Sequence, residues 1–94
     1  MKKLDRENII ETSWEIHAQV ESHYLSLSAK KGDEEWLEKQ RVLLADMALH
    51  LLQTALNPEE IELDKLRNNI NSILVICDQF LPEAKLKESA DKLF

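Results

Sequence analysis

The feature of this sequence that most constrains its fold is the apolar stretch Val42–Leu56, VLLADMALHLLQTAL. At about 100° per residue, its four polar side chains fall on one narrow stripe, and apolar side chains occupy the rest. The polar residues are Asp46, His50, Gln53 and Thr54. A surface helix usually has an apolar stripe a little over ~100° wide, so one neighbouring helix cannot cover this one. We therefore expect a central helix that packs against at least two others.

Local end signals divide the rest of the chain. Asp5 and Asp33 are suited to N-cap positions, and Gly32 suits the left-handed position that follows a helix. Asn57-Pro58 is the clearest boundary, because asparagine caps a helix and proline at its first position needs no hydrogen-bond partner. Pro82 disfavours the α conformation in the residue before it. The predicted helices span 5–29, 33–56, 58–81 (with an alternative break at 62–64) and 83–94.

The connections between these helices are short, which makes consecutive helices antiparallel. One glycine and two prolines leave little room for sheets, and 44% hydrophobic residues suffice for one core. A chain of 94 residues forms one domain. We therefore expect a single all-α domain over residues 1–94, an antiparallel up-down-up helical bundle of three long helices plus a short C-terminal fourth helix.

The charge balance limits the partners of this chain. Its formal net charge is −6, whereas nucleic acid and anionic membranes are bound through clusters of lysine and arginine. Its one cysteine, Cys77, has no partner for an intramolecular disulfide, so nothing indicates an oxidising compartment. The basic start is not followed by the apolar run of a secretory signal. We expect a cytoplasmic protein that binds neither nucleic acid nor membrane.

Two pairs of potential metal ligands are spaced four residues apart, His17 with Glu21 and Asp46 with His50. In an antiparallel hairpin that turns near Gly32, residue 17 lies at the height of residue 47, and helical bundles build carboxylate–histidine metal sites in this way. The helical pattern nevertheless turns His17 inward and Asp46 and His50 toward solvent. We therefore expect neither a metal site nor another cofactor.

No arrangement of residues indicates catalysis. Cys77 lies on the predicted core stripe between apolar neighbours, where a free cysteine is usually inert. With one glycine in the chain, we expect no Gly-rich phosphate-binding loop. The sequence predicts a protein without enzymatic activity, catalytic residues or a small-molecule substrate.

The central stretch and residues 75–76 carry more apolar surface than three helices of this size hide. Large exposed apolar patches tend to be interaction sites. The alternative is that residues 83–94 cover this surface. We favour a protein-binding surface, with the chain acting as an adaptor, regulator or small chaperone and forming a homodimer. The predicted partner-binding residues are Val42, Ala45, Leu49, Leu52, Leu56, Val75 and Ile76.

A second hypothesis starts from the acidic end of the predicted bundle. The first and third helices begin at the same end, which gathers six acidic residues. They are Asp5, Glu7, Glu11, Glu59, Glu60 and Glu62. Acidic residues at helix N-termini complement the helix dipole and need no further explanation. They would also suit an acidic antagonist, of the immunity, antitoxin or nucleic-acid-mimic type, that neutralises a basic target.

Overall fold

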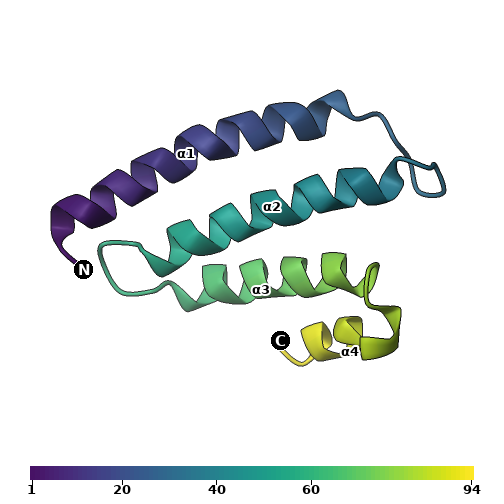
Figure 1. Ribbon diagram of the computed structural model, residues 1–94. Coiled ribbons are helices and arrows are strands. Elements are labelled where there is room, and N and C mark those ends of the chain that lie inside the picture. Colours follow the sequence, from purple (N-terminus) through teal and green to yellow (C-terminus); the bar gives the residue numbers. More distant parts are fainter.

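The computed structural model describes all 94 residues and contains only helices and their connections (Figure 1). The predicted all-α class is therefore confirmed. The helices are α1 (Lys3–Ser26), α2 (Trp36–Ala55), α3 (Leu63–Asp78), a short 3-10 helix (Pro82–Ala84) and α4 (Leu86–Asp91). None of these helices combines the length and the apolar character that crossing a lipid bilayer requires.

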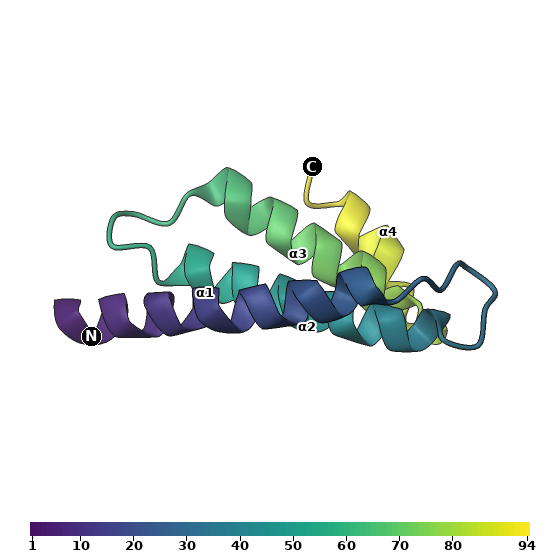
Figure 2. The ribbon, with the colours of Figure 1, turned by 90° about the horizontal axis from the view of Figure 1, so that it is seen from above.

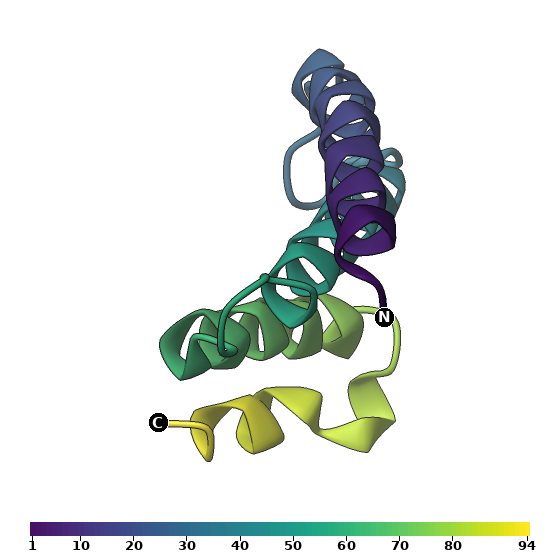
Figure 3. The ribbon, with the colours of Figure 1, turned by 90° about the vertical axis from the view of Figure 1, so that its left-hand side faces the viewer.

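Each helix packs against the next helix along the chain, so α2 lies between α1 and α3. The predicted coverage of the central helix by two neighbours is confirmed. Contact between α1 and α3 is marginal or absent, because they lie on different sides of α2 (Figure 3). Viewed from above, α1 lies along α2, whereas α3 is inclined to both (Figure 2). The result is a thin, bent bundle with extents of 44 × 33 × 16 Å.

The first connection differs from the predicted hairpin turn. Helix α1 ends at Ser26 and α2 begins at Trp36, so both helices are shorter than expected. Asp33 does not cap α2, because its carboxylate accepts a 2.7 Å hydrogen bond from the backbone N–H of Lys30 and closes a turn within the connection. Gly32 adopts a φ of 102°, the left-handed conformation expected of it, but within the connection and not at the end of α1.

The other boundaries also move. Helix α3 begins at Leu63 instead of residue 58, because the Asn57 side chain donates to the Glu60 carbonyl (3.3 Å) and does not cap a helix. The alternative break at 62–64 is therefore close to the observed start. The predicted fourth helix is divided by Lys85, whose φ of 52° separates the 3-10 turn from α4.

Side-chain amides and hydroxyls set the register between α2 and α3. At one end, Gln79 accepts from the indole N–H of Trp36 (2.9 Å) and donates to Gln40 (2.8 Å). At the other end, the Thr54 hydroxyl donates to Asn69 (2.6 Å). Gln40 is 4% exposed and Thr54 9%, so these bonds satisfy polar groups that water does not reach.

The apolar core is small. Only three apolar residues are buried, namely Ala29, Ile76 and Ala90. Ile76 belongs to α3 and Ala90 to α4. On α1 the one buried residue is polar, Ser13. Burial therefore supports α3 and α4 more than α1, which depends on its contacts with α2.

The network around Gln79 predicts a stability change. Gln79→Ala removes the donor to the buried Gln40 amide, which should lower the free energy of unfolding by about 1–3 kcal/mol. Urea denaturation measures the change. Ser22→Ala, at an exposed site of α1, is the control and should shift stability by less than about 0.5 kcal/mol. Equal effects of the two substitutions would contradict the assigned role of Gln79.

Candidate functional site

An apolar furrow runs between α1 and α2 on one face of the hairpin. Its two halves form shallow cavities of about 410 and 280 Å³. Four of the predicted partner-binding residues line it, namely Val42, Ala45, Leu49 and Leu52, together with Ile9, Ile16 and Val20 of α1. Ala45 and Ile16 are exposed, and Leu49 and Leu52 are half-buried. We call this surface the α1–α2 furrow.

The remaining predicted partner-binding residues lie elsewhere. Leu56 is half-buried just after α2, where its carbonyl accepts a hydrogen bond from Arg6 (3.2 Å). Val75 is 37% exposed but does not line the furrow. Ile76 is 5% exposed, so the expectation that it adds exposed apolar surface is wrong. Adjacent helical residues point about 100° apart, which lets Ile76 turn inward while Val75 stays exposed.

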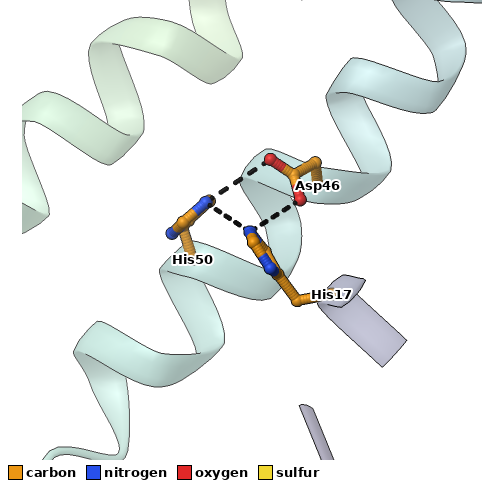
Figure 4. Close-up of side chains that lie close together, drawn as sticks. All are labelled: His17, Asp46 and His50. Atoms are coloured by element: carbon orange, nitrogen blue, oxygen red, sulfur yellow. Dashed lines mark hydrogen bonds and ion pairs between the residues drawn. The ribbon is translucent and has the colours of Figure 1, made fainter. Parts of the chain in front are cut away.

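A cluster of polar side chains joins α1 and α2 through His17, Asp46 and His50 (Figure 4). The Nε2 atoms of the two histidines are 3.1 Å apart. Asp46 Oδ1 lies 3.1 Å from His17 Nε2, and Asp46 Oδ2 lies 3.4 Å from His50 Nε2. The ion pairs formed by lysine and arginine each link residues three apart, whereas this cluster joins two helices.

The burial of this cluster overturns one expectation. The side chain of Asp46 is 13% exposed, so the prediction that it faces solvent is wrong, whereas that of His50 is 34% exposed and still reaches solvent. The helical pattern misled because the face of α1 that meets α2 is itself polar. Along that face, Ser13 accepts a hydrogen bond from Gln53 (3.1 Å), one helical turn beyond His50. Three residues of the polar stripe, Asp46, His50 and Gln53, therefore contact α1, whereas Thr54 meets α3.

Further side chains surround His17. Its second ring nitrogen, Nδ1, is 3.5 Å from Glu21 Oε2, and the ring of Trp14 packs edge-on at a centroid distance of 5.3 Å. A solvent-open cavity of about 370 Å³ reaches the cluster between the two helices. His50 also borders a second cavity, of about 450 Å³, which extends to Asn69 of α3. The cluster is thus held between the helices yet reachable from solvent.

Two other sequence features are placed by the structure. Cys77 is half-buried in α3, and its predicted inertness stays a prediction. Arg6 joins the start of α1 to the start of the α2–α3 connection, because it donates to the carbonyls of Leu56 and Asn57 (3.2 and 3.0 Å). Arg6 thereby stabilises the negative C-terminal end of α2 and places a positive charge among the acidic side chains.

No protein-family model, curated protein or solved structure matches this chain.

The contrast between neighbouring residues of α3 is testable by truncation. Ile76→Ala removes apolar atoms from a buried site and should lower the free energy of unfolding by about 2–5 kcal/mol. Val75→Ala, at the adjacent exposed site, is the control and should cost less than about 1 kcal/mol. Chemical denaturation of both variants measures the difference. Similar losses would show that Ile76 is not part of the core.

Proposed function

We propose that this chain is a non-enzymatic protein–protein interaction module, an up-down-up bundle that forms a homodimer through the α1–α2 furrow. The single observation that carries the proposal is the surface that the chain leaves uncovered. It exposes 6894 Å², whereas a compact monomer of 10.9 kDa exposes about 5,600 Å². Its radius of gyration is 14.9 Å, against about 12.4 Å for a compact domain of this length.

The excess of exposed surface over that of a compact monomer is large enough for an interface with a second copy of the chain. A stable interface of standard size buries roughly 800 Å² on each partner. The excess exposed surface is larger, on the order of 1,300 Å² by the same scaling. In a dimer with two-fold symmetry, the α1–α2 furrow of one copy would pack against the furrow of the other, because symmetric dimers use the same patch on both copies. Such a contact would cover the thinly packed hairpin of α1 and α2.

The composition of the furrow supports this choice of surface. Its apolar residues come from both helices, as the core of a dimer interface requires. Charged side chains, including Glu38 and Arg41, lie at one end, where they suit an interface rim. The opposite side of the hairpin holds the polar cluster instead. The furrow is therefore the better candidate for an apolar contact.

A charge placed in the furrow tests the proposal. Ala45→Glu introduces a carboxylate at an exposed position of α2, so the monomer should fold as before. Burial of that unpaired charge in the dimer should weaken self-association by roughly 100-fold or more. Sedimentation equilibrium across the micromolar range measures the dissociation constant, and far-UV circular dichroism checks the fold.

Ala18→Glu is the matched control, because Ala18 is also an exposed alanine within a helix but does not line the furrow. We expect the wild-type chain and Ala18→Glu to be dimers, and Ala45→Glu to be a monomer. A wild-type chain that remains monomeric at every concentration would refute the homodimer. Equal dimerisation of the two variants would refute the furrow as its interface.

The acidic antagonist remains a second candidate because the Arg6 hydrogen bonds bring two acidic segments together. The two functions differ in their response to salt. Docking of a basic partner on exposed carboxylates weakens as ionic strength rises, whereas an apolar interface tolerates salt. Sedimentation equilibrium repeated in high salt should therefore leave the dimer unchanged. Dissociation of the homodimer in high salt would refute an apolar interface.

A further inference from the structure

The cluster formed by His17, Asp46 and His50 has more acceptors than hydrogens to satisfy them. Glu21 Oε2 lies 3.5 Å from Nδ1 of His17. With the single proton of a neutral imidazole on Nδ1, Nε2 of His17 carries a lone pair. The His17–His50 contact then uses the Nε2–H of His50. Asp46 Oδ1 faces the same His17 lone pair at 3.1 Å and accepts no hydrogen bond, although it is buried.

A buried carboxylate oxygen without a donor is costly, and so is its approach to a nitrogen lone pair. A proton on His17 Nε2 would supply a donor to Asp46 Oδ1, but it would then face the N–H of His50. A cation at the centre of the cluster would contact both Nε2 atoms and the carboxylate together. The arrangement in Figure 4, with nitrogen and oxygen atoms from two helices converging on one point, is what such a cation requires.

The separations between these atoms approach those of a metal site. Tetrahedral Zn²⁺ has bonds of about 2.0–2.1 Å to histidine nitrogen and carboxylate oxygen, which places neighbouring ligand atoms about 3.3–3.4 Å apart. The Nε2 atoms of His17 and His50 are 3.1 Å apart, and they contact different oxygens of Asp46, at 3.1 Å (Oδ1) and 3.4 Å (Oδ2). One ligand atom from each residue lies within 4.8 Å of the other two. The two imidazole rings are inclined by 81°, so both present Nε2 without stacking. Small shifts of side chains would complete the coordination geometry.

We propose that His17, Asp46 and His50 bind one Zn²⁺ ion, with water as the fourth ligand. Two imidazoles and a carboxylate suit Zn²⁺ better than Mg²⁺ or Ca²⁺, which prefer oxygen ligands. The cavity of about 370 Å³ gives water access to the fourth position. Glu21 is the positioning residue, because a carboxylate on the second nitrogen of a ligating histidine fixes its tautomer and orientation.

The ion would act as a clamp between two helices. His17 belongs to α1, and Asp46 and His50 belong to α2. Since α1 packs chiefly on α2 and buries only Ser13, a metal bond across this interface would hold the least buried of the long helices. Zn²⁺ should therefore raise the stability of the chain, because it binds the assembled hairpin and not the separated helices.

Isothermal titration calorimetry of ZnCl₂ into the full chain, without a polyhistidine tag and freed of metal by chelator, tests the site. We expect saturable binding of one ion per chain in the micromolar range or tighter, and a higher melting temperature with Zn²⁺. Titration with MgCl₂ should give no saturable heat. This stoichiometry is read per chain, so its outcome is independent of whether the chain dimerises.

The third histidine of the chain provides the matched control. His23 is exposed on α1 and lies outside the cluster, so His23→Ala should bind Zn²⁺ like the wild type. His17→Ala and His50→Ala should lose more than about 100-fold in affinity, and Glu21→Gln about 10-fold. Asp46→Asn keeps the side-chain shape and should also bind weakly, which preserves the test if a histidine variant fails to fold.

Absence of saturable binding to the wild-type chain would overturn the proposal. So would equal weakening by His17→Ala and His23→Ala, or full affinity in Asp46→Asn. Co²⁺ provides an independent readout, because a tetrahedral nitrogen and oxygen site gives it strong visible absorption. The spectrum should appear with the wild type and His23→Ala and be lost with His50→Ala.

Discussion

The structure depends on the position of α2 between two helices that do not support each other. Because α1 and α3 meet α2 on different sides, α1 packs chiefly on α2. Helix α2 therefore has three sides that make different kinds of contact. One meets α3 through apolar packing and amide bonds, one meets α1 through the polar cluster, and one forms the floor of the furrow.

Polar contacts set the register of the α1–α2 hairpin. Arg6 bonds to the backbone at the end of α2, Ser13 bonds to Gln53, and the ammonium of Lys39 lies 4.8 Å from the ring centroid of Tyr24. Such contacts are directional, so a shift by one helical turn would break all three together. They hold His17 opposite Asp46 and His50. An apolar interface of the same size would tolerate sliding more readily.

The existence of the helices was predicted more accurately than the residues at which they end or the sides on which they pack. The apolar width of Val42–Leu56 correctly required two neighbours for α2. Asn57 and Asp33 both failed as caps because their side chains bond within the connections instead. Counting from the predicted turn placed residue 17 at the height of residue 47, next to the Asp46 that His17 contacts, but the inward orientation of Asp46 was not predicted. A polar stripe can face either solvent or a polar face of another helix. Ser13 and His17 on α1 were the residues that could have indicated such a face, because they contact Gln53 and Asp46 of α2.

The strictly sequential packing has a consequence for how the chain folds. Contacts between neighbours in sequence close short loops, so the entropy lost before each contact forms is small and folding should be fast. Stability then resembles that of a repeat protein, as a sum of individual helices and nearest-neighbour interfaces. Loss of α1 would remove one interface and leave the α2–α3–α4 unit with its own buried residues. The chain is thus a linear array of helices, in which each helix can fold against the neighbour that has already formed.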